Sequence, residues 1–175
     1  NEPFSVILAD DLIDGVGSSC LQQMVTAYGN HHCSILAAQR VPPQETAKYG
    51  IVKATEIEPR TSRVEAMVEK PKPEEAPSDL AVVGRYVLTP RIFDLIETTG
   101  RGAGGEIQLT DAIAALLKEE QVLAWEFSGK RYDCGSKLGY LEATVEYALK
   151  HTELKDDFCA YLRDLAEGDV CRPQE

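Results

Sequence analysis

The apolar residues of the chain follow two alternating periods. Six short apolar runs that are rich in β-branched residues predict strands. They cover residues 5–8, 34–39, 50–55, 64–69, 81–88 and 122–127. Stretches with apolar residues at helical spacing predict helices over residues 21–28, 90–97 and 109–119. Short strands that alternate with helices are typical of the α/β class, with a mainly parallel sheet covered by helices.

Apolar residues also recur at helical spacing in two consecutive segments near the end of the chain, 137–150 and 154–165. We interpret these segments as helices that pack against the chain or against another subunit. Residues 1–150 are therefore expected to form the main domain and residues 151–167 a C-terminal helix. The polar residues 168–175 are expected to be a disordered tail.

Composition narrows the class of protein. The chain has 175 residues, of which 43% are hydrophobic, enough for one packed domain or most of one. Its 29 acidic and 18 basic residues give a net charge of -11, which excludes an extended basic surface for nucleic acid. Anionic small molecules stay possible, because a few cationic groups and a divalent cation reverse the field inside one cleft.

The cysteines and the hydropathy of the sequence indicate the cellular compartment of the protein. The five cysteines include no C-x-x-C pair and no cluster with zinc spacing, which favours free thiols in a reducing cytoplasm. No apolar stretch reaches the roughly 20 residues that span a membrane, and the start lacks a signal-peptide pattern. The sequence therefore predicts a cytoplasmic protein with no membrane partner.

The start of the sequence carries its own signal. The first residue is Asn1, not methionine, and an apolar strand follows almost at once. We expect the chain to be a fragment whose N-terminal part is missing, with a processed terminus as the alternative.

Two acids, Asp10 and Asp11, directly follow the first predicted strand. Ligand crevices in open α/β sheets lie beyond the carboxyl ends of strands, so a carboxylate placed there is positioned to hold a metal. Mg²⁺ prefers oxygen ligands and commonly takes one or two carboxylates together with substrate phosphates. Capping of the following turn explains the same residues equally well.

A second strand ends in Glu69 and Lys70, and Pro71 prevents its continuation. A carboxylate beside an ammonium suits a phosphorylated sugar, because the carboxylate accepts hydrogen bonds from hydroxyls and the ammonium neutralises phosphate. On spacing alone, a surface turn is the better interpretation.

A glycine-rich stretch, residues 100–105, leads into the helix predicted at 109–119. It lacks the G-K-[ST] ending of a P-loop and does not follow the dinucleotide fingerprint. Glu106 is a candidate for contact with a sugar hydroxyl, whereas Thr110 and Asp111 also suit the start of a helix.

A fourth motif, residues 129–135, places Asp133 in a tight loop flanked by glycines. Asp133 is a candidate second carboxylate for the same cation, with capping as the alternative. The three histidines have no visible partner for a catalytic triad or a metal site.

These motifs occur together in one order. The order is LADD at 8–11, YG at 49–50, VEKP at 68–71, VGRYVL at 83–88, GGEIQLTD at 104–111, DCG at 133–135 and KLGY at 137–140. The set closely resembles that of the bacterial UTP-glucose-1-phosphate uridylyltransferases over residues 4–165. The resemblance implies a Rossmann-like fold of the nucleotide-diphospho-sugar transferase type.

The resemblance also implies roles for individual residues. Asp10 and Asp133 resemble the carboxylates that hold Mg²⁺, and Asp11 lies beside them near the product. The family has proline where Ala9 stands. The implied sugar-phosphate contacts are Tyr49, Gly50, Glu69, Lys70 and Glu106, with Lys70 on the phosphate.

The implied reaction joins UTP and glucose 1-phosphate into UDP-glucose and pyrophosphate, with attack on the α-phosphate. Catalysis then rests on Asp10, Lys70 and Asp133, and no serine, cysteine or histidine nucleophile is needed. The family's opening G-x-G-T-R loop, which holds the nucleotide, is not found in this sequence. The resemblance further implies a homo-oligomer, a dimer or a tetramer. A dTTP-using relative and a non-catalytic regulatory paralogue are the alternatives.

Overall fold

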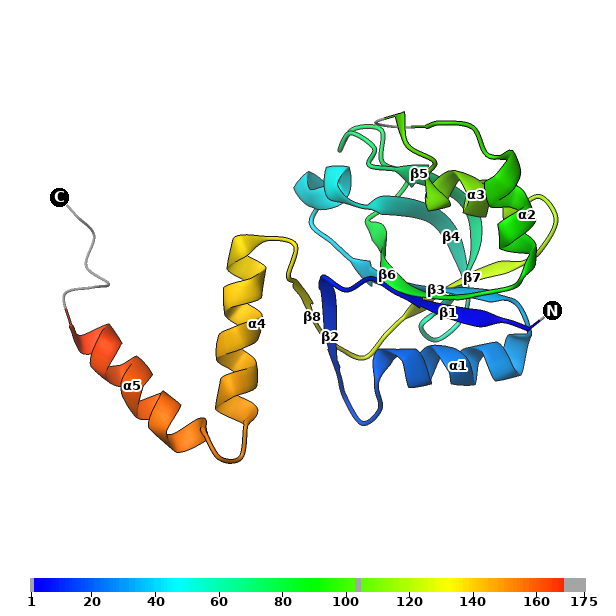
Figure 1. Cartoon of the computed structure of the whole chain (residues 1–175). Coiled ribbons are helices and arrows are strands. Elements are labelled where there is room, and N and C mark those ends of the chain that lie inside the picture. Colours follow the sequence, from blue (N-terminus) through cyan, green and yellow to red (C-terminus); the bar gives the residue numbers. More distant parts are fainter. Residues whose placement is uncertain (1, 103–104, 169–175) are drawn as a thin grey trace. The chain divides into compact units, whose positions relative to one another are not determined.

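The computed structural model describes residues 2–102 and 105–168. The chain, drawn in Figure 1, divides into two compact units. The boundary lies between Arg131 and Tyr132. The predicted tail, apart from Gly168, lies outside the described residues, as do Asn1, Ala103 and Gly104.

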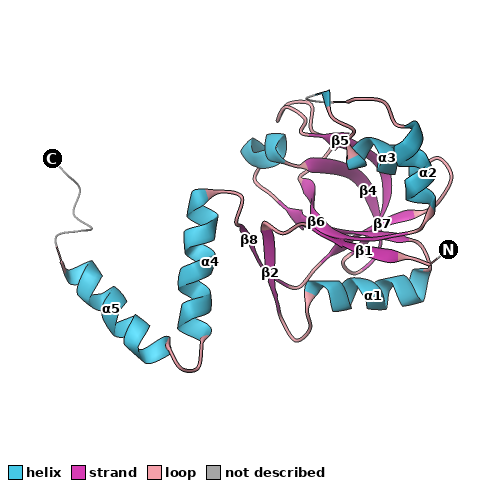
Figure 2. Cartoon of the chain, in the orientation of Figure 1, coloured by secondary structure: helices cyan, strands magenta, loops and turns pink. Residues whose placement is uncertain are grey.

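The first unit holds most of the strands and three helices (Figure 2). Its strands are β1 (Phe4–Ile7), β2 (Asp11–Gly15), β3 (Ser34–Arg40), β4 (Gly50–Glu58), β5 (Thr61–Glu69), β6 (Leu80–Leu88) and β7 (Val122–Glu126), with the start of β8 (Gly129–Asp133). Its helices are α1 (Cys20–His31), α2 (Arg91–Thr98) and α3 (Leu109–Leu116), together with a short 3-10 helix, η1 (Pro43–Lys48).

Six strands form one sheet in the order β1-β6-β3-β7-β5-β4, and β4 pairs in addition with β6. Strand β6 is long enough to pair with β1, β3 and β4. The pairings from β6 through β3, β7, β5 and β4 therefore return to β6. This curvature brings the end of β5 and the middle of β6 toward one region of the unit.

The α/β class is confirmed, but the expected mainly parallel pairing is wrong for the described strands. Only β3 and β7 pair in parallel, and the other pairings in this sheet are antiparallel. The connections explain the difference. Two residues join β4 to β5, which permits only an antiparallel hairpin, whereas the chain between β3 and β7 includes α2 and α3 and so allows a crossover.

Both faces of the sheet are buried. Along β3, Leu36 and Ala38 belong to a core cluster with residues of α2 and α3, such as Ile113. The alternate residues Ile35 and Ala37 pack with α1 on the opposite face (Figure 1). Burial on both faces explains why this strand reads as a continuous apolar run.

The six predicted strands and three central helices are found, with ends shifted by a few residues. Helix α1 begins after Ser19, whose hydroxyl accepts the backbone N–H of Gln22 at 3.2 Å. Strands β2 and β8, which form a separate two-stranded sheet, were not predicted. Their sequences, DLIDG and GKRYD, are too polar and short to show strand periodicity.

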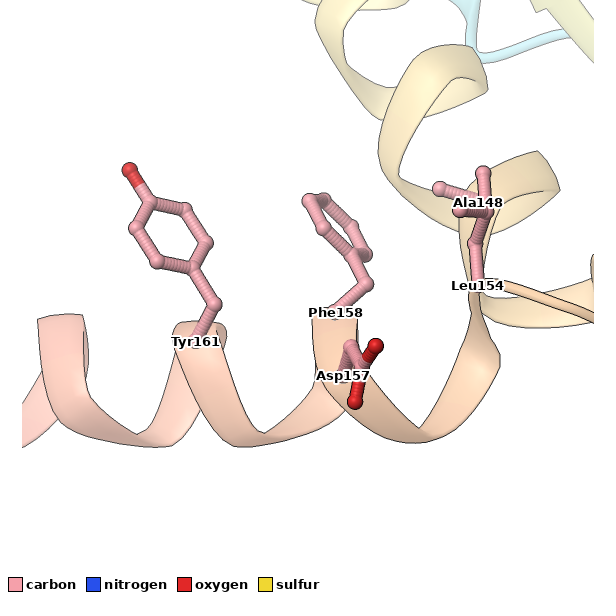
Figure 3. Close-up of a pocket in the computed structure, with 5 residues that line it drawn as sticks. All are labelled: Ala148, Leu154, Asp157, Phe158 and Tyr161. Atoms are coloured by element: carbon pink, nitrogen blue, oxygen red, sulfur yellow. The ribbon is translucent and has the colours of Figure 1, made fainter.

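The second unit contains α4 (Lys137–Lys150) and α5 (Lys155–Glu167), which confirm the two predicted C-terminal helices. Ser136 caps α4 by accepting the N–H of Gly139 at 3.0 Å. Ala148 of α4, Leu154 and the α5 residues Phe158 and Tyr161 line an apolar pocket, as does Asp157 (Figure 3). None of the helices within the described residues is long and apolar enough to cross a membrane.

The burial of both faces of the sheet is tested by measuring stability. Ile113 is fully buried beside the sheet, so Ile113→Ala is expected to lower the free energy of unfolding by about 2–5 kcal/mol. Ile57 is 41% exposed, and Ile57→Ala is expected to change stability by no more than roughly 0.5 kcal/mol. Urea titration of both variants measures the difference. Equal losses would contradict the assignment of α3 to the core.

Candidate functional site

Asp10 and Asp11 follow β1 as predicted, but the structure gives them different surroundings. Asp11 begins β2 and is 5% exposed. Its Oδ2 accepts the backbone N–H of Gly84 at 2.6 Å, and its Oδ1 pairs with Nε of Arg131 at 2.5 Å. Asp10 is exposed, and within residues 2–102 and 105–168 no hydrogen bond or ion pair engages its carboxylate.

Gly84 permits the close approach of Asp11 to β6. A Cβ added at Gly84 would lie 2.7 Å from Cβ of Leu8 and 2.9 Å from Oδ2 of Asp11. Neither contact is tolerable, so a larger residue would displace the carboxylate from the Gly84 amide. The lack of a side chain here is therefore part of how the Asp11 carboxylate is held.

Arg131 lies between Asp11 and Tyr49. Its Nη1 donates to the Tyr49 hydroxyl at 3.1 Å, and its guanidinium carbon lies 5.0 Å from the centroid of the Tyr49 ring, a cation–π distance. Burial lowers the pKa of Arg131, but hydrogen bonds to Asp11 and Tyr49 outweigh it, and the net pKa is raised. The guanidinium therefore stays charged.

The residues Tyr49, Gly50, Glu69 and Lys70 come together where β4 begins and β5 ends. Gly50 lies opposite Glu69 in the antiparallel register. The backbone N–H of Lys70 donates to the carbonyl of Tyr49 at 3.0 Å. The β-hairpin thus assembles two motifs that are about 20 residues apart in the sequence.

The two carboxylate oxygens of Glu69 face different partners. Its side chain is 16% exposed, and its Oε2 accepts the hydroxyl of Thr110, the second residue of α3, at 2.5 Å. The Lys70 ammonium lies 3.8 Å from Oε1 of Glu69 and is 59% exposed. The Lys70 backbone has φ 44°, a left-handed conformation that is unusual for a residue other than glycine.

Tyr86 lies on the same side of β6 as Gly84, because residues two apart in a strand share a face. Burial raises the pKa of the Tyr86 phenol to about 12, and the charges of Glu69 and Asp11 add to this effect while Arg131 opposes it. The phenol is therefore a neutral group within the field of both carboxylates.

Two predicted residues are not in this group. Glu106 is exposed, and its backbone carbonyl accepts the N–H of Gly102 at 2.8 Å. Asp133 lies in the second unit, where its Oδ1 accepts the N–H of Gly135 at 3.1 Å and its carbonyl accepts the Ser136 hydroxyl at 3.0 Å. These bonds form the turn that the capping interpretation predicts.

The described residues contain no group of three or more His, Cys, Asp and Glu side chains that could hold a metal ion. The predicted metal site has only two protein ligands, Asp10 and Asp133, because substrate phosphates complete the coordination shell of Mg²⁺. The two-carboxylate site therefore stays a prediction.

The sequence did not single out Arg131, Gly84 or Tyr86 as site residues. Each stands inside a motif that was noted for its neighbours, and none has a periodic or spacing signal of its own. The contacts of these residues depend on the pairing of distant strands, which a sequence pattern does not encode.

Comparison with known proteins identifies the family to which the chain belongs. A model of the nucleotidyl transferase family matches residues 1–150. The chain belongs to this family. Over 145 residues it is 58% identical to the UTP-glucose-1-phosphate uridylyltransferase of Pseudomonas aeruginosa, a match that covers 82% of this chain and 52% of that protein.

Two further similarities point the same way. The chain is 45% identical over 173 residues to UTP-glucose-1-phosphate uridylyltransferase 2 of Streptococcus pyogenes, with 96% of this chain and 58% of that protein covered. A solved structure of UDP-glucose pyrophosphorylase complexed with UDP-glucose matches with a TM-score of 0.83 and 45% identity, covering 86% of this chain and 58% of that one. The resemblance drawn from the motifs is confirmed. The chain spans a little over half the length of the curated relatives it matches.

The backbone at Lys70 predicts a conflict between stability and function. Because glycine adopts positive φ without steric cost, Lys70→Gly is expected to be more stable than Lys70→Ala by about 1 kcal/mol, although both lose the ammonium. Urea unfolding measures both variants. Arg60, with φ 67°, is the matched control and is expected to show the same difference between glycine and alanine. An alanine variant as stable as the glycine variant at Lys70 would contradict the strained backbone.

Proposed function

We propose that this chain is the sugar-phosphate and metal-binding part of an enzyme that makes UDP-glucose and pyrophosphate from UTP and glucose 1-phosphate. The observation that carries the proposal is the region where β4 begins and β5 ends, in which Glu69 and Lys70 lie beside Tyr49 and Gly50. The names of the Pseudomonas aeruginosa and Streptococcus pyogenes relatives support UTP and glucose 1-phosphate as the substrates.

Glu69 and Lys70 divide the recognition of glucose 1-phosphate between them. In this proposal, Oε1 of Glu69, which faces Lys70 at 3.8 Å and does not bind Thr110, accepts hydrogen bonds from sugar hydroxyls. The exposed Lys70 ammonium neutralises the phosphate next to the same sugar. The backbone of the Tyr49–Gly50 turn contacts the glucose, and Glu106 is proposed as a further contact from its exposed loop.

We propose Asp10 and Asp133 as the ligands of Mg²⁺. Nucleotidyl transferases of this kind generally use a divalent metal. The Asp10 carboxylate fits this role because it is exposed and not engaged elsewhere in the described residues, whereas Asp11 is already committed to Gly84 and Arg131. When bound, the ion supplies charge neutralisation at the phosphates. Asp11 then acts beside the site and not as a ligand.

In the proposed reaction, a phosphate oxygen of glucose 1-phosphate attacks the α-phosphorus of UTP, and the bond to the pyrophosphate breaks. The attacking phosphate is already ionised, so no side chain has to remove a proton. The protein's contribution is alignment and electrostatic stabilisation, which Lys70 provides at the attacking phosphate.

We further propose a cytoplasmic homo-oligomer, a dimer or a tetramer. The cysteines Cys20, Cys33, Cys134 and Cys159 are free thiols, which suits a reducing compartment. Helix α5 has no buried residue in the described structure, and its Tyr161 is 56% exposed, so an apolar surface is available for a second subunit.

The choice of nucleotide base and of sugar phosphate is tested in a full-length hybrid protein. In this hybrid, the present chain replaces the corresponding segment of the Pseudomonas aeruginosa relative. We expect pyrophosphate release from UTP with glucose 1-phosphate, measured by a coupled assay, and at least about tenfold lower kcat/KM with dTTP. The 175-residue chain alone is expected to show no turnover, because it spans about half of its relatives.

The unmodified relative serves as the positive control for this assay. A preference of the hybrid for dTTP would overturn the assignment of UTP. A folded hybrid that binds UDP-glucose without turnover would instead favour a regulatory, non-catalytic role. Synthesis by the 175-residue chain alone would refute the expectation that it needs the remaining half.

The metal assignment is tested in the same hybrid. Asp10→Asn and Asp133→Asn each remove a charged oxygen ligand, so we expect at least a roughly 100-fold lower kcat and a higher Mg²⁺ concentration for half-maximal rate. Asp94→Asn, at an exposed residue of α2 paired with Arg91, is the matched control. Near-normal turnover of Asp133→Asn at limiting Mg²⁺ would eliminate Asp133 as a ligand.

A further inference from the structure

Arg131 connects two segments that carry different parts of the proposed site. Its side chain is only 10% exposed. Nε faces Asp11 at the start of β2, while Nη1 and the plane of the guanidinium face Tyr49, just before β4. One side chain therefore touches both the acidic motif and the first residue of the sugar motif.

At the Asp11 end, the contact fixes the backbone next to the proposed metal ligand. Asp11 is bonded to Arg131 through one oxygen and to the Gly84 amide through the other, at 2.6 Å. Both carboxylate oxygens are thus engaged, and Asp10 is the preceding residue. A displacement of Asp11 moves Asp10 with it, because one peptide bond joins them.

On the Tyr49 side, Arg131 is linked to the proposed sugar-phosphate residues through one backbone hydrogen bond. The carbonyl of Tyr49 accepts the N–H of Lys70 at 3.0 Å. The next residue, Gly50, pairs with Glu69 in the strand register. The position of the Tyr49 ring is therefore coupled to both Glu69 and Lys70.

Arginine is suited to this double contact in a way that lysine is not. The guanidinium is planar, its Nε and Nη atoms donate in separate directions, and its face stacks on an aromatic ring. A lysine ammonium forms the ion pair with Asp11 but cannot also stack on Tyr49 as a plane. The pair is buried as well, so water does not replace a lost contact readily.

We propose that Arg131 is a positioning residue for the transfer reaction. It fixes the spacing between Asp10 and the Glu69–Lys70 pair, and so aligns the phosphates of the two substrates. Arg131 acts through Asp11 and Tyr49 and does not itself touch the reacting atoms. The catalytic consequence rests on the proposed function, whereas the coupling between the two segments does not.

The kinetic test uses Arg131→Lys and Tyr49→Phe in the full-length hybrid. Arg131→Lys keeps the charge, so misalignment is expected to lower kcat by about 10- to 100-fold. The KM for glucose 1-phosphate is expected to change by less than about threefold, because Glu69 and Lys70 keep their own side chains. Tyr49→Phe removes only the hydroxyl bonded to Arg131 and is expected to lower kcat by roughly two- to fivefold.

The matched control is Arg40→Lys. Arg40 is 59% exposed and pairs with Asp79 at 2.7 Å on the surface, so its kinetics are expected to equal those of the unmodified hybrid. Circular dichroism measures the folded fraction of each variant. A kcat of Arg131→Lys within twofold of the unmodified value overturns the proposal, and so does a loss that only follows the folded fraction.

The coupling itself is tested without turnover, by amide NMR on the 175-residue chain. Asp11→Asn is expected to shift the amide signal of Lys70 as well as that of Gly84, and the Lys70 shift is expected to disappear in the Arg131→Lys background. No Lys70 response to Asp11→Asn overturns the proposal. A clear response together with an inactive unmodified hybrid keeps the coupling and refutes the proposed function instead.

Discussion

Asp11 and Arg131 form a buried ion pair on which the arrangement of the site depends. Charges removed from water are tolerated only with good geometry and further hydrogen bonds, and both partners meet this condition. Asp11 has the Gly84 amide, and Arg131 has the hydroxyl and ring of Tyr49. Loss of one partner from such a pair typically costs about 3–5 kcal/mol, because the other charge stays buried. Four segments that are distant in sequence, at Asp11, Tyr49, Gly84 and Arg131, are therefore held together around one pair.

The sheet makes this pair possible. Strand β6 pairs with β1, β3 and β4, so Gly84 in its middle lies beside the end of β1 while its first residues reach the start of β4. The close contact of Asp11 with Gly84 needs both this register and the absence of a side chain. Helix α3 contributes from one face, since Thr110 near its start binds Glu69. The fold therefore positions the described site residues mainly through strands, and α3 adds a direct contact.

Much of this architecture could be predicted from the sequence, and the failures have physical causes. Apolar runs such as that of β3 identified the strands, because burial on both faces leaves a strong signal. The direction of the strands left no such signal in the sequence, since direction depends on connections such as the two-residue link between β4 and β5. The motifs, through the resemblance, gave Tyr49, Glu69 and Lys70 as contacts of one sugar phosphate, and the hairpin brings these three residues together. The motifs did not reveal that Asp11 is committed to Arg131 and Asp10 is not, because burial of adjacent residues after a strand depends on the partner strand.

The elevated pKa of Tyr86, about 12, affects how the charge of the site depends on pH. The phenol remains a neutral hydroxyl through the physiological range, and Arg131 beside it remains a cation. In the described structure, none of the three histidines is hydrogen-bonded to Tyr86 or Arg131, and His31 is bonded instead to Glu58. Tyr86 and Arg131 therefore keep the same charges on either side of neutral pH.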